Sequence, residues 1–139
     1  MTAPGSSLTV DASVVVALLV DKGPAGEWSI AQCQGHPLIA PNLLPFEVAN
    51  VLRRQLRAGL ISPDRAHAAH RAAVDLRVQL WPYQVVADRV WALRDTLTSY
   101  DAACCAVAEL AQAPLVTLDS RLARAQGPSC EIRVFGTTI

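Results

Sequence analysis

Two short apolar segments of the sequence each end on an aspartate, and each is followed at once by residues that suit a helix. Leu8 to Val10 precedes Asp11, and Leu115 to Leu118 precedes Asp119. A short apolar run bounded in this way predicts a buried strand of a parallel sheet. Ligands of open parallel sheets bind at the carboxyl ends of the strands. The two aspartates are therefore expected at the edge of the sheet where a functional site would lie.

The rest of the chain alternates between further strands and helices, with no hairpin signal between them. We expect strands over 8–10, 38–40, 78–81, 115–118 and 132–135. We expect helices over 13–20, 25–33, 44–58, 62–75, 85–97, 101–110 and 120–125. The first of these helices has a valine-rich run that also fits a strand, and the last has Ser120 as its expected N-cap.

This alternation predicts an α/β fold in three layers, with a mostly parallel central sheet and helices on both faces. The length of 139 residues fits a single domain over 1–139 that buries a sizeable core. Residues 1–7 are rich in small and turn-forming types, so we expect them to form a flexible tail.

Composition narrows the class of protein. The chain is 52% hydrophobic and 17% charged, which is typical of a globular domain. Its twelve basic and twelve acidic residues balance, so no overall positive field attracts nucleic acid. The apolar run at 12–20 is too short to span a bilayer, and no basic segment precedes it. Four cysteines without a C-x-x-C pair are expected to be free thiols. We therefore expect a soluble cytoplasmic protein that is not attached to a membrane.

Four carboxylates fall where the sites of α/β proteins are built. Asp11 and Asp119 end strands, whereas Glu47 and Asp101 lie in the first turns of helices, and these places can converge at one edge of a parallel sheet. Clustered carboxylates repel one another, and a hard divalent cation removes the conflict. Oxygen ligands suit Mg²⁺ or Mn²⁺, which keep water molecules and leave room for a substrate phosphate. Each acid taken alone is also explained as a turn former, a helix-end charge or a surface residue.

The order and local sequence of these acids resemble those of the PIN-domain ribonucleases, specifically the VapC-type toxins of bacterial toxin–antitoxin pairs. The most specific stretches are 97–103, which contains Asp101, and 114–123, which contains Asp119. The segment 45–54 resembles the glutamate-bearing helix of that family, and the likeness runs over nearly the whole chain. The resemblance implies a PIN-like three-layer fold and metal-dependent endonucleolytic cleavage of RNA.

The resemblance also implies roles for individual residues. Those that would bind Mg²⁺ or Mn²⁺ and carry the catalysis are Asp11, Glu47, Asp101 and Asp119. Those that would support the acids or contact the substrate are Ser13, Asn50, Thr117 and Arg121. Local hydrogen bonding, solvent exposure or a salt bridge explains the supporting residues as well. Some relatives carry a further acid just after the last aspartate, whereas Ser120 and Arg121 follow it here, which places a second metal ion in question.

The family further implies an RNA substrate, a homodimer and a small cognate antitoxin whose tail fills the groove near the site. Two other functions compete with this interpretation. A receiver-like regulatory module also binds Mg²⁺ at strand-end acids, but it needs a lysine after a late strand, and the only lysine is Lys22. A catalytically inactive PIN-like module that binds RNA would lack at least one of the four acids. All four are present, so the sequence favours an Mg²⁺-dependent endoribonuclease that acts as the toxin of a toxin–antitoxin pair.

Overall fold

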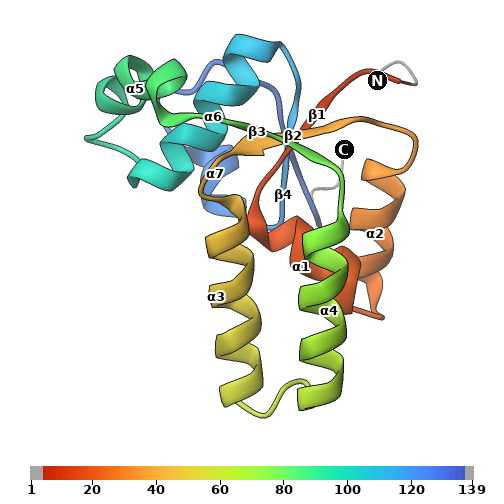
Figure 1. The fold of residues 1–139 in the computed structure, drawn as a ribbon. Helices are drawn as coiled ribbons and strands as arrows, with labels where there is room; N and C mark the ends of the chain where they lie inside the picture. The colour runs from red at the N-terminus through yellow and green to blue at the C-terminus, as the bar shows by residue number, and fades with distance from the viewer. Residues whose placement is uncertain (1–4, 137–139) are drawn as a thin grey trace.

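The computed structural model describes residues 5–136, which form a five-stranded parallel sheet with helices on both faces (Figure 1). The strands are β1 (Leu8–Val10), β2 (Leu38–Pro41), β3 (Val78–Trp81), β4 (Leu115–Thr117) and β5 (Ile132–Val134). The helices are α1 (Ala12–Val20), α2 (Pro24–Cys33), α3 (Leu44–Arg57), α4 (Pro63–Asp75), α5 (Tyr83–Ala92), α6 (Ser99–Ala111) and α7 (Ser120–Arg124). The predicted α/β fold with a parallel central sheet is confirmed. Of the predicted N-terminal tail, residues 1–4 lie outside the described residues.

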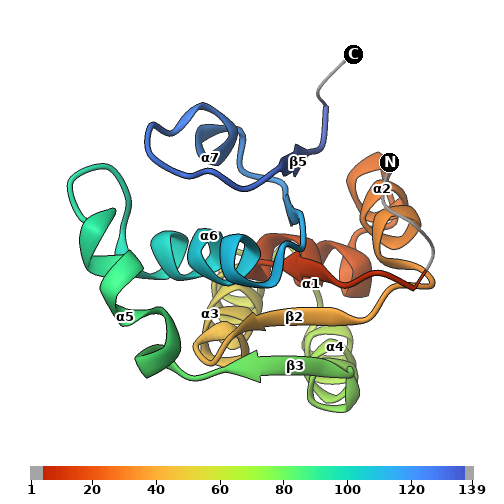
Figure 2. The same ribbon diagram turned by 90° about the horizontal axis from the view of Figure 1, so that it is seen from above.

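The sheet has the strand order β3-β2-β1-β4-β5, which is visible when the molecule is viewed from above (Figure 2). β1 lies at the centre, where Thr9 pairs with Ile39 of β2 on one side and with Leu115 of β4 on the other. The chain adds β2 and β3 outward on one side and β4 and β5 on the other, so the direction of winding reverses at β1. The carboxyl ends of strands at such a reversal are the usual place for a ligand site in an open α/β sheet. Asp11 and Asp119 both follow strands that meet there.

Two apolar cores cover the two faces of the sheet. On one face α1 packs against α2, α3 and α4, and on the other α5 packs against α6. Helix α6 is buried along Ala102–Ala108, and it contacts β1, β2 and β4. Its small residues allow this close approach to the sheet, as its nearly continuous apolar sequence predicted.

Several helices begin at a residue whose side chain accepts a hydrogen bond from the backbone of the first turn. The Asp11 carboxylate accepts a hydrogen bond from the Val14 backbone N–H at 3.2 Å, which starts α1 and confirms that the valine-rich run is helical. The predicted cap of α7 is wrong, because Asp119 rather than Ser120 is its N-cap. The Asp119 carboxylate accepts from the Arg121 backbone N–H at 2.9 Å, so it satisfies a donor of the first turn itself.

Helix α5 ends five residues before its predicted end at residue 97. The backbone N–H of Thr96 donates to the Leu93 carbonyl at 3.1 Å, and the Thr96 hydroxyl donates to the Gln126 carbonyl at 3.0 Å. These bonds favour turns over continued helix, although the apolar spacing goes on through Leu97.

Helices α3 and α4 form an antiparallel hairpin that projects away from the sheet (Figure 1). Its turn lies at 58–62, at the far end of α3 from Glu47. None of the helices in the described part of the chain is long and apolar enough to cross a membrane.

Candidate active site

Asp11 is the most buried of the four acids, with 5% of its surface exposed. Its Oδ1 accepts hydrogen bonds from the Ser13 hydroxyl at 2.6 Å and from the Val14 N–H at 3.2 Å, and its Oδ2 accepts one from the Thr117 hydroxyl. Burial raises the pKa of Asp11 above its ordinary value of 3.8, and these three hydrogen bonds oppose the rise. The carboxylate is thus held in one orientation at the end of the central strand.

Two hydroxyls join Asp11 to the end of β4. Ser13 and Thr117 each donate to the Asp11 carboxylate, and each accepts from a backbone N–H of the segment that follows β4. Ser13 Oγ accepts from Leu118 N at 3.0 Å, and Thr117 Oγ1 accepts from Asp119 N at 3.0 Å. Each hydroxyl has a single proton and already accepts from a backbone N–H, so its own proton points toward the Asp11 carboxylate. The structure therefore places two of the four predicted supporting residues, Ser13 and Thr117, against the first acid.

Asp101 lies in the first turn of α6, half-buried, where Thr98 caps the helix by accepting from the Asp101 N–H at 3.3 Å. Burial raises the pKa of the Asp101 carboxyl, and the negative charge of Asp119 adds to the rise. The negative charge of Asp101 in turn helps to raise the pKa of Asp11. These three aspartates therefore lie close enough to influence one another's protonation.

Asp119 differs from the other two aspartates because it has a cationic partner. Its Oδ2 accepts from Arg121 Nη2 at 2.7 Å and its Oδ1 accepts from Arg121 Nε at 3.0 Å. Hydrogen bonding by Arg121 holds the pKa of Asp119 below 3.8. The sequence left Arg121 open between a contact with RNA and a salt bridge, and the structure contains the salt bridge.

Glu47 lies half-buried in the first turn of α3, and Asn50 is exposed one turn further along the same helix. The thiol of Cys104, which is fully buried in α6, lies near enough to Glu47 and to two of the aspartates to be affected by their charges. Burial raises the pKa of Cys104, and the negative charges of Asp11, Asp101 and Glu47 add to the rise. The charge of Glu47 therefore acts on the same buried thiol as the charges of Asp11 and Asp101, whereas Asn50 makes no hydrogen bond to Glu47 within residues 5–136.

Tyr100 is a residue near the site that sequence reasoning missed. Its hydroxyl is the buried side-chain oxygen that has no hydrogen-bond partner within residues 5–136. Burial raises the pKa of Tyr100, and the Cys104 thiol and the negative charge of Asp11 act in the same direction. Its position directly before Asp101, in the first turn of a helix, was the available signal.

The carboxylates of the site can be compared with what a divalent metal ion needs from its ligands. Within residues 5–136 no three His, Cys, Asp or Glu side chains are grouped closely enough to form a complete protein cage for a metal. Mg²⁺ does not require such a cage, because it keeps several waters and commonly binds to one or two carboxylates plus substrate phosphate. Asp11 and Asp101 are two oxygen donors, raised in pKa by burial, and the described residues supply neither with a salt-bridge partner. The residues fit a hydrated hard cation bound to this pair.

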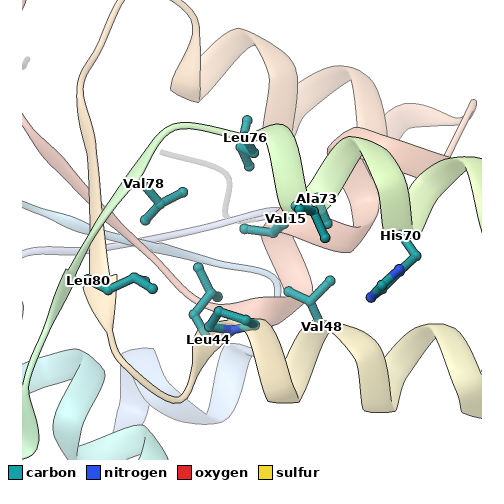
Figure 3. Close-up of a pocket in the computed structure, with 10 residues that line it drawn as sticks. Val15, Leu44, Val48, His70, Ala73, Leu76, Val78 and Leu80 are labelled. Atoms are coloured by element: carbon teal, nitrogen blue, oxygen red, sulfur yellow. The ribbon is translucent and has the colours of Figure 1, made fainter.

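A separate apolar cleft of about 340 Å³ lies between α3, α4 and β3 (Figure 3). Val15, Val48 and Leu80 are among its lining residues, and His70 points toward it from α4. None of the four acids lines this cleft, so it does not belong to the acidic site.

A parallel sheet with acids at the point where its winding reverses is typical of nucleotide- and metal-binding α/β domains. The family model of the PIN domain matches residues 8–128. Ribonuclease VapC1 of Mycobacterium tuberculosis is 37% identical over 126 residues, which cover 90% of this chain and 95% of that protein. Ribonuclease VapC12 of the same organism is 32% identical over 127 residues, covering 91% of this chain and 98% of that protein. The crystal structure of PAE2754 from Pyrobaculum aerophilum matches with a TM-score of 0.64 and 25% identity, over 94% of this chain and 85% of that one. The chain belongs to the PIN-domain family and, within it, to the VapC-type ribonucleases, as its sequence predicted.

Proposed function

We propose that this chain is an endoribonuclease that depends on Mg²⁺, with Mn²⁺ as the alternative ion, and that it acts as the toxin of a toxin–antitoxin pair. Membership of the VapC-type ribonucleases supports RNA as the substrate. The observation that carries the metal dependence is the surroundings of Asp11. This buried carboxylate lies beside the charge of Asp101, and it has no salt-bridge partner among residues 5–136. A buried negative charge of this kind costs free energy, and a bound cation lowers that cost.

Asp11 and Asp101 would hold the ion, and Glu47 and Asp119 would complete the acidic surface around it. A divalent ion bound there would supply an activated water and stabilise the negative charge that develops on the phosphate. Ser13 and Thr117 keep the Asp11 carboxylate in one orientation, so it need not reorganise when substrate binds.

Arg121 and Asn50 are proposed to act on the substrate side of the site. The guanidinium of Arg121 is exposed and sits on the Asp119 carboxylate, where it can approach an RNA phosphate. Asn50 is exposed on α3, one turn after Glu47, where its amide can contact RNA.

The partners follow from the same family membership. We propose a homodimer, a small cognate antitoxin that inhibits the site, and a cytoplasmic location without membrane attachment. The balanced charge of the chain, with twelve basic and twelve acidic residues, is compatible with storage in a complex.

The test is cleavage of a panel of structured RNAs by the purified protein, with Mg²⁺ and with excess chelator. Asp101→Asn and Asp119→Asn should abolish cleavage while the proteins remain folded. Asp64→Asn is the matched control, because Asp64 also lies in the first turn of a helix but is exposed on α4. Full activity in chelator, or in both site variants, would contradict the metal mechanism.

The role as a toxin is tested in cells. Expression should halt growth, and Asp11→Asn should relieve the arrest at equal protein level. A short upstream reading frame whose product binds the chain and restores growth would identify the antitoxin. Growth arrest that persists with Asp11→Asn would separate toxicity from this site.

A further inference from the structure

Two of the four cysteines lie together where α6 packs against the segment that precedes β5. Cys105 is fully buried in α6, and Cys130 is half-buried in the segment before β5. Cys130 packs against the apolar cluster that contains Cys105, and the two thiols lie close enough to shift each other's pKa. These are thiols from two different elements, 25 positions apart in the chain, that lie side by side.

The backbone around Cys130 is fixed to its surroundings on both sides. The Ser129 N–H donates to the Glu109 carboxylate at 2.7 Å, and the Glu131 carbonyl accepts from the Leu115 N–H at 2.9 Å. Glu109 is four residues after Cys105, so both side chains lie on one face of α6. The Ser129–Glu109 bond therefore brings Cys130 opposite Cys105, and Figure 2 shows the chain between α7 and β5 passing beside α6.

A second link holds the same segment from its start. Arg89 donates to the Gly127 carbonyl at 2.8 Å while its guanidinium also pairs with Glu109 at 2.7 Å. The residues just before Cys130 are thus held in place before any covalent bond forms. Because disulfides require a narrow range of geometry, two thiols held side by side can close with little movement of the backbone.

The surroundings give the two thiols different roles. Interaction with the Cys105 thiol lowers the pKa of Cys130, and the charge of Arg89 acts in the same direction, whereas burial and the charge of Glu109 oppose it. Interaction with the Cys130 thiol and burial raise the pKa of Cys105. Cys130 also lines an open cavity of about 400 Å³, so a small molecule can reach it from solvent. The more acidic and more accessible thiol is the one that attacks first.

We propose that Cys105 and Cys130 form a reactive dithiol that low-molecular-weight disulfides oxidise to an intramolecular disulfide. The Cys130 thiolate attacks one sulfur of the small disulfide, forming a mixed disulfide and releasing one small thiolate, which takes up a proton. Cys105 then loses its proton and attacks the Cys130 sulfur, which releases the second small thiol. Two protein thiols are oxidised and one small disulfide is reduced to two thiols.

The bridge would fasten the segment before β5 to α6, the helix that carries Asp101. It would close a loop of about 25 residues that contains β4, Asp119 and α7, which restricts the unfolded chain. Oxidation would therefore stabilise the C-terminal part of the domain while leaving the acidic site outside the bridge itself.

The test treats the reduced full-length protein with oxidised glutathione and counts thiols after unfolding. Titratable thiols should fall from four to two, the intact mass should drop by two hydrogens without a glutathione adduct, and the melting temperature should rise by about 5–10 °C. Cys105→Ala should stop at a glutathione adduct on Cys130, and Cys130→Ala should form neither bridge nor adduct at that position.

Cys104→Ala is the matched control, because Cys104 neighbours Cys105 and is equally buried, and Cys33→Ala tests the remaining thiol. Both should oxidise as the parent protein does. A bridge that still forms in Cys105→Ala, or a stable glutathione adduct on Cys130 in the parent protein, would overturn the proposal. Since Cys130 is only half-buried, Cys130→Ala decides the matter even if Cys105→Ala is unstable.

Discussion

The guanidinium of Arg121 holds both oxygens of the Asp119 carboxylate, although the two residues are only two positions apart at the start of α7. The Arg121 side chain is 78% exposed, so this ion pair contributes little to folding. Its effect is on charge, because it forms a salt bridge with one of the acids, while neither Asp11 nor Asp101 has a salt-bridge partner among the described residues. Net negative charge in the acidic site is therefore concentrated at Asp11 and Asp101 rather than at Asp119.

Replacing Arg121 with glutamine should raise the pKa of Asp119 toward its ordinary value of 3.8, because hydrogen bonding by Arg121 is the main cause of the lowering. RNA binding should weaken, and the unfolding midpoint should not change. Carbon-detected NMR titration of the Asp119 carboxyl measures the first effect. Arg124→Gln, on the same short helix, is the comparison: the charge of Arg124 also lowers the pKa of Asp119 but contributes less than Arg121, so the rise should be smaller. An unaltered Asp119 titration in Arg121→Gln would contradict this account.

The stability of the metal-free protein should fall as pH rises above about 4, the ordinary range of aspartate. Burial raises the folded-state pKa values of Asp11 and Asp101 above 3.8, so the folded protein binds more protons than the unfolded chain between these values. Their stabilising contribution is complete below pH 3.8 and is lost as pH rises through the raised pKa values. The pKa of Asp119 is lowered from 3.8 and that of Glu109 from 4.5, so their opposite effect on stability ends at about pH 4.5.

Thermal melts between pH 4 and 7 check this slope, and Asp101→Asn should flatten it. Addition of Mg²⁺ at pH 7 should raise the melting temperature of the parent protein more than that of Asp101→Asn. A parent protein whose melting temperature climbs steadily to pH 7 without metal would show that burial of these acids is not the controlling factor.

Thr117→Val should destabilise the fold by about 1–3 kcal/mol, because it leaves Asp11 Oδ2 and the Asp119 N–H without their shared partner. Thr9→Val is the matched control, since Thr9 is equally buried on the neighbouring strand and its hydroxyl bonds only to the Ala113 carbonyl. Urea unfolding should detect a loss in both variants. Cleavage should fall much further in Thr117→Val, and equal cleavage by the two variants would remove Thr117 from the site.

Tyr100→Phe should stabilise the protein by about 1 kcal/mol, because it removes a buried hydroxyl without a hydrogen-bond partner among the described residues. Because the hydroxyl, unpartnered within residues 5–136, is free to bind substrate near Asp11, cleavage should nevertheless fall about tenfold, the effect of losing one hydrogen bond to the substrate. Chemical unfolding and single-turnover cleavage give the two readings. Tyr83→Phe, exposed at the start of α5, should change neither. A less stable Tyr100→Phe would mean that the hydroxyl has an unseen partner such as water.

The arrangement of the fold followed from local signals, and its clearest error in the length of a helix came from a competing hydrogen bond. All five predicted strands are present, because short apolar runs between turn residues leave few alternatives in an α/β chain. Helix α5 stopped at Ala92 instead of residue 97, since Thr96 bonds to the Leu93 and Gln126 carbonyls. Periodicity cannot detect this bond, because the apolar residues keep their spacing through the turn.

The sequence named candidate site residues, but it did not predict the hydrogen bonds and ion pairs between them. Ser13 and Thr117 were named as supporting residues, yet only the structure reveals that each hydroxyl joins Asp11 to a backbone N–H beyond β4. The Arg121 ion pair and the unpartnered Tyr100 hydroxyl depend on side-chain directions that spacing does not encode. The assignment of the four acids as metal ligands stays a prediction.

The projecting hairpin of α3 and α4 has a practical consequence. Its turn at 58–62 lies about 20 Å along α3 from the base of the helix, and Leu60 at this turn is 72% exposed. A break in the chain at Gly59 would place Asp11 and Glu47 on one fragment and Asp101 and Asp119 on the other. Neither fragment alone could be toxic under the proposed mechanism. The two halves could therefore serve as a split enzyme whose activity would report the association of proteins fused to them.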